Sequence, residues 1–365
     1  MNYLDIEKRG RDKIKEYRNV ALFGAGSYLK EVLESFRSYK IVAIFDNGVK
    51  EDEVRAENNI PILNPKYHLN EYVDKDTAVV MSVCSFQYEI AVDLIQNYHL
   101  DPNQIFSMCA DYQEERIYHA EDILNHVDEL EQARSILYDE ESRQYLDRMI
   151  KFKFTHDPLC LKPNPHIIGK YMYQEADGNT IMAKKGNHII DGGAFIGDSA
   201  EYFFALTEGD CQLYCFEPFI GNYKILDKTI CEKNRKDKVK TYNYALGDKD
   251  TTIKVSADND ISARANKDAN EITENYITQK RLDSLANEFD RIDFIKLDVE
   301  GDEKNVLLGA KELIKNHSPR MMVSAYHKTE DLWELPLLLH KLNPEYRIYL
   351  GHQPHAAFEP EIYVG

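Results

Sequence analysis

The chain has 365 residues, of which 43% are hydrophobic, which is enough for two compact domains with buried cores. Asp and Glu number 63 against 45 Lys and Arg, so the formal net charge is −18. This acid excess argues against unaided binding to nucleic-acid phosphates or to anionic lipid surfaces. It favours a neutral small-molecule or carbohydrate-like substrate.

The first residues show no basic and apolar leader, and no apolar run approaches the roughly 20 residues that a membrane-spanning helix needs. Six cysteines are scattered along the chain rather than framed at short spacings. We therefore expect a cytoplasmic protein with reduced thiols and no membrane span. Cys211 and Cys215 lie within one apolar run without a second pair nearby, so we expect them in a core rather than on a metal.

The first hundred residues alternate short apolar runs with amphipathic stretches, a pattern typical of parallel strands joined by helices. We predict a small Rossmann-like α/β domain over residues 1–112. Its expected strands and first helix are, in chain order, strand 20–23, helix 27–38, and strands 41–45, 78–83 and 105–108.

Residues 113–156 are highly charged and repeat apolar residues at helical spacing, which predicts a helical connector. Three prolines between 157 and 165 then break the helical pattern. We place the start of a second domain there and extend it over 157–365. The expected fold class is α/β, with two Rossmann-like domains joined by the helical connector.

A glycine-rich turn follows a short apolar strand at residues 188–199, which read HIIDGGAFIGDS. Glycines at a strand-to-helix turn let the backbone approach a ligand, and we expect Asp198 or Ser199 to cap the next helix. Dinucleotide sites use G-x-G-x-x-G to rest a pyrophosphate on a helix N-terminus. Here Asp191 directly precedes the glycines, so the turn suits a cationic ligand and would repel a pyrophosphate.

Polar residues also end three further predicted strands. Glu217 follows the strand 213–216, where doubly wound folds place the carboxylate that accepts ribose hydroxyls. A strand at 239–244 leads into Ala245, and a strand at 292–297 ends at Asp298. Because ligands bind at the carboxyl edge of open α/β sheets, these ends predict one crevice.

The spacing of DGGAFIG at 191–197, FEP at 216–218, RLDSL at 281–285 and IDFIKLDVEG at 292–301 resembles the FkbM-type methyltransferase family. The resemblance covers roughly residues 185–350 and implies a class I methyltransferase fold for the C-terminal domain, with S-adenosylmethionine as its cofactor. It places the cofactor's methionine part on Asp191 and Gly193, its ribose on Glu217 and its adenine near Asn243 and Ala245. The other turn residues that we expect to line the cofactor are Gly192, Ala194, Gly197, Asp198 and Ser199.

Methyl transfer requires that a nucleophile be aligned behind the sulfonium and, for a hydroxyl, that its proton be removed. His327 follows a strand that we expect to neighbour the one ending at Asp298, and its ordinary pKa suits a base near neutrality. Asp298 could orient His327 or bind substrate hydroxyls. Lys296 lies in mid-strand, where a buried charge needs a partner, and we expect it to pair with a carboxylate.

Three alternatives remain open for these catalytic candidates. His327 could be a rim histidine with local hydrogen bonds only. Asp298 and Glu300 could cap a helix that we expect from Gly301 or Asp302 through Leu313. A divalent ion on Asp298, Glu300 and His327 is chemically reasonable, but the spacing does not require one, and we predict no metal.

The N-terminal strand, Gly24-Ala25-Gly26-Ser27 and then Asp46 about twenty residues later resemble the opening of a nucleotide or nucleotide-sugar fold. Leu29 stands in place of the third glycine of the dinucleotide fingerprint. Three hypotheses follow for Gly24, Gly26, Ser27 and Asp46: a nucleotide or nucleotide-sugar site, a degenerate scaffold for homodimerisation or substrate delivery, and a redox NAD site.

We therefore predict O-methylation of a sugar, nucleotide-sugar or glycan-precursor hydroxyl. Two alternatives are an NAD-dependent sugar oxidoreductase that uses the N-terminal domain and a non-catalytic nucleotide-binding scaffold.

Overall fold

The computed structural model describes residues 10–51, 53, 55–107, 120–255, 275–356 and 358–365. The chain divides into two compact units. The first unit comprises Met1–Arg134, Asp139–Pro165 and Leu350–Pro360, and the second comprises Ser135–Tyr138, His166–Tyr349 and Glu361–Gly365. Most of the predicted connector thus belongs to the first unit, and so does a short segment close to the C-terminus.

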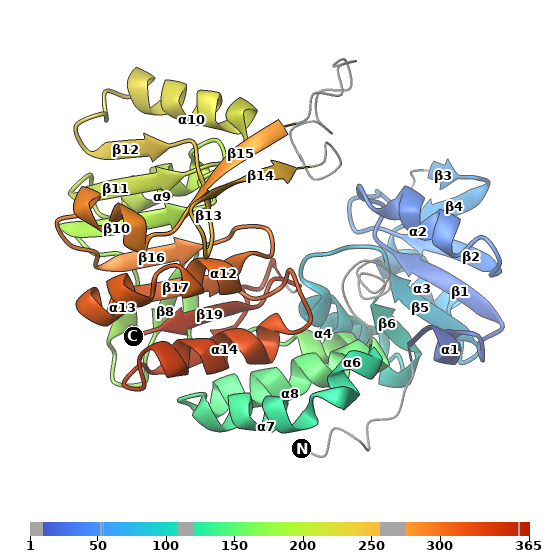
Figure 1. The fold of residues 1–365 in the computed structure, drawn as a ribbon. Coiled ribbons are helices and arrows are strands. Elements are labelled where there is room, and N and C mark those ends of the chain that lie inside the picture. Colours follow the sequence, from blue (N-terminus) through green and yellow to red (C-terminus); the bar gives the residue numbers. More distant parts are fainter. Residues whose placement is uncertain (1–9, 52, 54, 108–119, 256–274, 357) are drawn as a thin grey trace. The chain divides into compact units, whose positions relative to one another are not determined.

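The first unit is built on a six-stranded sheet of order β3-β4-β2-β1-β5-β6 (Figure 1). All neighbouring strands run parallel except β3 and β4, which form an antiparallel pair that the sequence analysis did not predict. The strands are β1 (Asn19–Phe23), β2 (Ile41–Phe45), β3 (Arg55–Glu57), β4 (Ile60–Leu63), β5 (Thr77–Met81) and β6 (Ile105–Ser107).

Helices accompany these strands, and apolar residues on both faces of the sheet form two buried clusters. The helices are α1 (Gly10–Ile14), α2 (Leu29–Ser35), α3 (Pro65–Tyr72), α4 (Gln87–Tyr98), α6 (Ala120–Asn125), α7 (Val127–Ile136) and α8 (Glu140–Thr155). Short 3₁₀ turns lie at Pro102–Gln104 and Pro158–Leu161. Part of the predicted connector, residues 113–119, lies outside the described residues.

The second unit contains a seven-stranded sheet of order β12-β11-β10-β16-β17-β19-β18. The five strands from β12 to β17 run parallel, and β19 pairs antiparallel with β17. Their bounds are β10 (Asn187–Gly192), β11 (Cys211–Phe216), β12 (Val239–Tyr242), β16 (Phe294–Leu297), β17 (Arg320–Ser324), β18 (Ile348–Gly351) and β19 (Glu361–Val364). The predicted α/β class with parallel sheets is confirmed.

Apolar side chains of α9 (Asp198–Leu206) and α10 (Ile220–Glu232) pack on one face of this sheet, in one core with residues of β10, β11 and β16. α12 (Glu303–Leu308) and α13 (Lys311–His317) contact α14 (Asp331–Leu342). Two small sheets complete the unit: β7 (Ile167–Gly169), β8 (Met172–Gln174) and β9 (Thr180–Ile181), and then β13 (Ala245–Leu246), β14 (Thr251–Val255) and β15 (Asn275–Lys280). A 3₁₀ helix spans Asp283–Glu288.

The expectation of one helix through Leu313 is wrong. The helix is interrupted at Gly309 and Ala310, between α12 and α13. A side chain at Gly309 would lie 2.0 Å from the carbonyl oxygen of Gly247, so the helix passes too close to a neighbouring loop to carry one there. The expected cap is also wrong. α9 begins at Asp198, and Gly197 is its N-cap without any side-chain cap.

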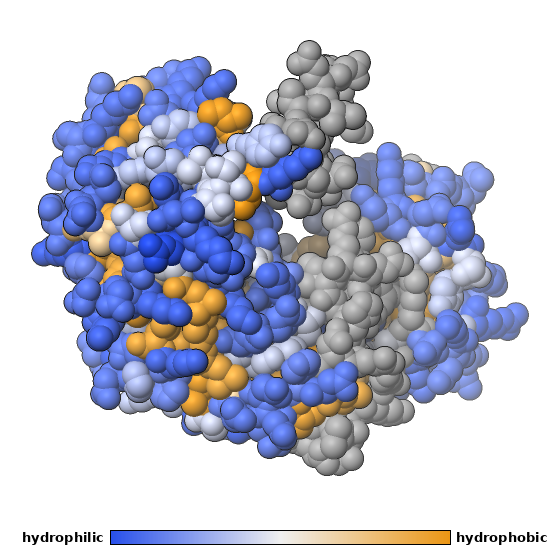
Figure 2. Space-filling view, in the orientation of Figure 1, coloured by the Kyte–Doolittle hydropathy of each residue, from blue (hydrophilic) through white to orange (hydrophobic). Residues whose placement is uncertain are grey.

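No helix among the described residues is long and apolar enough to cross a bilayer. The face of the second unit seen in Figure 2 is mostly hydrophilic with small apolar patches, in line with the acidic composition. No disulfide joins the described cysteines, namely Cys84, Cys160, Cys211, Cys215 and Cys231, whereas Cys109 lies outside the described residues. Cys211 and Cys215 belong to the core as predicted.

Replacement of Gly193 by alanine should destabilise the second unit more than the same change at Gly178. Both glycines have positive φ, +79° and +86°, so the backbone strain of an alanine is matched. Only at Gly193 does the new Cβ collide, 1.8 Å from the carbonyl oxygen of Asp298. We expect Gly193→Ala to cost about 1–3 kcal/mol more in unfolding free energy, as overpacking does. Chemical denaturation of both variants measures this, and equal losses would contradict the close approach of the two strand ends.

Candidate functional site

The carboxyl ends of four neighbouring strands of the second unit carry most of the predicted site residues. Glu217 follows β11, Gly193 follows β10, Asp298 follows β16, and His327 lies three residues beyond β17. Contacts join these ends in order: the amide of Phe195 in the β10 turn donates to Glu217 Oε2 at 3.0 Å, and the amide of Asp298 donates to the Gly192 carbonyl at 3.1 Å. The parallel pairing of β16 and β17 confirms that Asp298 and His327 come from neighbouring strands.

Lys296 is the buried cation beneath this edge. Its ammonium lies 3.3 Å from Asp191 Oδ1 and donates to the carbonyls of Gly192 at 3.2 Å and Gly193 at 2.7 Å. Burial by itself lowers the pKa of Lys296, but the charges of Asp191 and Asp298 outweigh it and raise the pKa above its usual range. The predicted pairing of this mid-strand lysine with a carboxylate is confirmed.

Asp191 is fully buried, and its second oxygen accepts a 2.6 Å hydrogen bond from the hydroxyl of Ser199. Its charge is therefore balanced inside the protein by Lys296. The Ser199 hydroxyl donates to Asp191 and does not cap the helix. Asp198 is the turn residue that faces outward, and its carboxylate lies 3.5 Å from the Lys170 ammonium. Direct contact of Asp191 with a ligand stays a prediction that this burial does not favour.

Glu217 is buried at the end of β11, with 4% of its surface exposed. Besides Phe195, the amide of Phe219 donates to Oε1 at 3.0 Å, so one backbone N–H orients each oxygen. Burial raises the pKa of Glu217 to about 7, against the lowering effect of these hydrogen bonds. Oε1 also accepts from the Asn222 side-chain amide at 3.4 Å, so the remaining acceptor capacity for a ligand hydroxyl lies on Oε2.

The predicted adenine residues lie beside Glu217. The Asn243 amide donates to the carbonyls of Glu217 at 3.0 Å and Pro218 at 2.9 Å, which fixes the course of the chain after β11. Ala245 begins β13 and is half-buried. In the β10 turn, Ala194 is buried and its amide donates to the Phe216 carbonyl at 3.0 Å, and Gly197 closes the turn.

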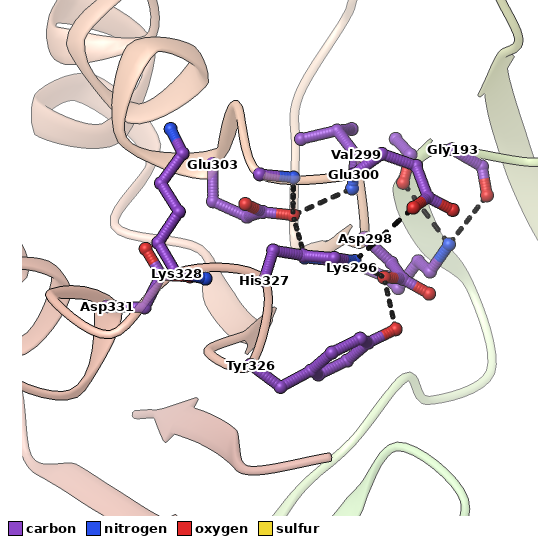
Figure 3. A network of polar contacts seen from close by, with 12 residues as sticks. Gly193, Lys296, Asp298, Val299, Glu300, Glu303, Tyr326, His327, Lys328 and Asp331 are labelled. Atoms are coloured by element: carbon purple, nitrogen blue, oxygen red, sulfur yellow. Dashed lines mark hydrogen bonds and ion pairs between the residues drawn. The ribbon is translucent and has the colours of Figure 1, made fainter. Parts of the chain in front are cut away.

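The imidazole of His327 lies between carboxylates on both sides (Figure 3). Its Nδ1 is 3.1 Å from Glu303 Oε1, and its Nε2 is 3.7 Å from both Asp298 Oδ1 and Glu300 Oε2. Burial alone would lower the pKa of His327, but Glu303, followed by Asp298 and Glu300, raises it above its usual value. The imidazole thus contacts three carboxylates, and both its catalytic role and the alternative of a rim histidine stay predictions.

Asp298 is half-buried and accepts a 2.9 Å hydrogen bond from the Tyr326 hydroxyl. Burial raises its pKa, but Lys296, His327 and the hydrogen bonds reverse this, so the net pKa is lowered. Glu300 is mostly exposed beside it. Neither carboxylate caps α12, whose N-cap is Asp302 without a side-chain capping hydrogen bond.

Sequence reasoning missed Glu303 and Tyr326. Glu303 lies in the first turn of α12, where an acidic residue is expected for the helix dipole alone. Its spacing of three residues from Glu300, across Gly301, is the signal that could have revealed it.

Ligand atoms of Asp298, Glu303 and His327 lie within 4.8 Å of one another. This set differs from the one considered on sequence, which had Glu300 in place of Glu303, and such acidic groups are common without an ion.

The N-terminal candidates lie in the first unit and form a separate group. Asp46 follows β2, and its carboxylate accepts from the amides of Ala25 at 2.9 Å and Gly48 at 2.7 Å. Gly24 and Gly26 flank Ala25 in the turn after β1, and Ser27 is exposed. A side chain at Gly24 would lie 2.2 Å from Val83. Asp46 thus accepts hydrogen bonds from the turn after β1 and from its own turn after β2. The three hypotheses for this group stay predictions.

Comparison with known proteins found a family model that matches part of the chain, mostly in the second unit. Residues 191–353 match the model described as Methyltransferase FkbM domain. A solved FkbM methyltransferase from Methylobacillus flagellatus KT is similar with 19% identity over 96% of this chain and 90% of that chain, and a TM-score of 0.65. At that identity the likeness shows a shared fold.

Two further solved structures are more distant. Fibrillarin from Aeropyrum pernix, solved with bound S-adenosyl-L-methionine, has 11% identity over 56% of this chain and 86% of its own, with a TM-score of 0.34. A SAM-dependent methyltransferase from Aquifex aeolicus has 12% identity over 50% of this chain and 84% of its own, with a TM-score of 0.32. No curated protein sequence matches the chain. The family match is thus to a methyltransferase FkbM domain over residues 191–353, and the parallel strand order of the second unit is consistent with it.

Proposed function

We propose that this protein is an S-adenosylmethionine-dependent O-methyltransferase that acts on a hydroxyl of a sugar, nucleotide-sugar or glycan precursor. The observation that carries the proposal is the continuous row of strand ends from Glu217 through the β10 turn to Asp298 and His327. It offers a hydroxyl-accepting carboxylate at one end and an imidazole among carboxylates at the other.

The residues present fit the cofactor. Glu217 Oε2 accepts one backbone N–H and keeps a lone pair to which a ribose hydroxyl can donate, at the strand end where doubly wound folds place the ribose carboxylate. Asp298 and Glu300 supply negative charge near the region where a sulfonium would lie. When bound, S-adenosylmethionine supplies an electrophilic methyl group.

The acceptor side is assigned to Asp298, Glu300 and His327. Carboxylates accept hydrogen bonds from hydroxyls and repel phosphates, which supports a hydroxyl-bearing, locally uncharged acceptor. His327 Nε2 would take the proton of the attacking hydroxyl, and Asp298 would orient that hydroxyl or the ring. Lys296 holds the turn and Asp298 in place from below.

Affinity for S-adenosylhomocysteine should depend on pH through Glu217. The carboxyl has a pKa of about 7 without ligand, and its ionised form is the hydrogen-bond acceptor that the ribose requires, so affinity should fall about tenfold per pH unit below that value. Calorimetric titration across this range should also show proton release on binding. Glu217→Gln should weaken binding and remove the pH dependence, whereas Glu232→Gln, an exposed change at the far end of α10, should alter neither. A pH-independent affinity would contradict the assignment of the ribose to Glu217.

Loss of His327 should separate chemistry from cofactor binding. His327→Gln should lower kcat by about 10²–10⁴-fold, the range of general acid–base catalysis, with an unchanged dissociation constant for S-adenosylhomocysteine. The assay follows transfer of a labelled methyl group to a panel of sugars and nucleotide sugars. If the protein binds NAD and not S-adenosylhomocysteine, the proposal is wrong and the oxidoreductase alternative replaces it.

A further inference from the structure

Glu303 is a fully buried carboxylate whose position is set by the backbone. Its Oε1 accepts from the amide of Val299 at 2.9 Å and from the amide of Gly301 at 3.4 Å. These two donors belong to the turn between β16 and α12, in which Glu300 and Gly301 both have positive φ, 57° and 96°. The carboxylate therefore cannot rotate away without breaking the hydrogen bonds that close this turn.

The fixed oxygen Oε1 lies 3.1 Å from His327 Nδ1. The two groups form an ion pair when the imidazole is protonated, but they are not aligned as a hydrogen bond. No other described residue offers Nδ1 a hydrogen-bond partner. A carboxylate at this place favours a proton on Nδ1, because a bare lone pair there would face a negative charge. The other nitrogen, Nε2, then faces Asp298 and Glu300 on the open side of the site.

We propose that Glu303 is the positioning residue of His327: it holds the proton on Nδ1 and so leaves Nε2 as the atom that takes the acceptor's hydroxyl proton. This inference rests on the proposed function. In the transfer step, the acceptor oxygen forms a bond to the methyl carbon, the carbon–sulfur bond breaks with its electron pair on sulfur, and the hydroxyl proton moves to Nε2. Glu303 touches neither reactant.

The charged groups around the imidazole determine its titration. Asp298 and Glu300 face it from the end of β16, Glu303 from α12 and Asp331 from α14, while Lys296 is the buried cation behind Asp298. Burial, followed by the charge of Glu303, raises the pKa of Asp331 to about 7. A neutral residue at 303 should lower the pKa of His327, since Glu303 is the largest contribution that raises it.

The test is the protonation state of His327, read by nitrogen NMR of protein with ¹⁵N-labelled histidine, with His327→Gln used to assign its signal. At a pH above the end of its titration the imidazole is neutral, and there we expect the Nδ1–H form, the opposite of the form that free histidine prefers. Glu303→Gln should shift the ring toward the Nε2–H form and move its titration to lower pH. The exposed substitution Glu312→Gln on α13 should change neither.

Activity gives a second measurement that a purely structural role would not change. The alkaline rise of kcat in Glu303→Gln should shift to lower pH with a reduced plateau, while S-adenosylhomocysteine affinity stays constant. Glu303→Asp keeps the charge and should recover the wild-type position of the rise in part.

Three outcomes would overturn the inference. The first is an Nε2–H ring in the wild-type protein, which needs no variant to fold. The second is an unchanged tautomer in Glu303→Gln. The third is activity that EDTA removes and Mg²⁺ restores, since Asp298, Glu303 and His327 would then serve as metal ligands. The NMR measurement requires no substrate, so its failure is distinct from a failure to bind S-adenosylhomocysteine or to transfer methyl groups.

Discussion

The buried ammonium of Lys296 is the interaction on which the site's architecture depends. It lies in the middle of the sheet and connects the β10 turn to β16 through Asp191 and two backbone carbonyls. Removal of one partner from a buried ion pair costs about 3–5 kcal/mol, because the other charge remains without compensation. The glycine-rich turn, the end of β16 and therefore Asp298 are placed relative to one another by this one cation.

This pairing changes the electrostatic argument drawn from sequence. The acidic turn was expected to attract a cationic ligand through Asp191, but that carboxylate is neutralised internally and fully buried. The acidic groups nearest the exposed edge are instead Asp298 and Glu300, one strand away, both beside His327. A cationic ligand at this edge therefore stays a prediction, and the carboxylates that would face it differ from the one named on sequence.

The sequence predicted most of what depends on local pattern. Apolar runs located β10, β11, β16 and β17, and the rule that ligands bind at the carboxyl edge brought Glu217, Asp298 and His327 to one rim. What it missed depends on tertiary contacts. The break at Gly309 follows from the approach of the Gly247 loop, and the burial of Asp191 follows from Lys296 on another strand. The first contact has no signal in the surrounding sequence, and for the second the sequence predicted a carboxylate partner for Lys296 but not that this partner is Asp191.

Glu303 shows why such residues escape sequence reasoning. An acid in the first turn of a helix is favourable for the dipole alone, so its presence needs no further explanation. The structure separates the two roles, because a residue that serves only the dipole can remain exposed, whereas Glu303 is buried and is held by two amides against an imidazole. Under the proposed function, the fixed, buried groups Lys296 and Glu303 would set the geometry of the proton chemistry, while the exposed Glu300 could adapt to an acceptor. We therefore expect the choice of acceptor to reside in the exposed rim of the site and the transfer chemistry in its buried support.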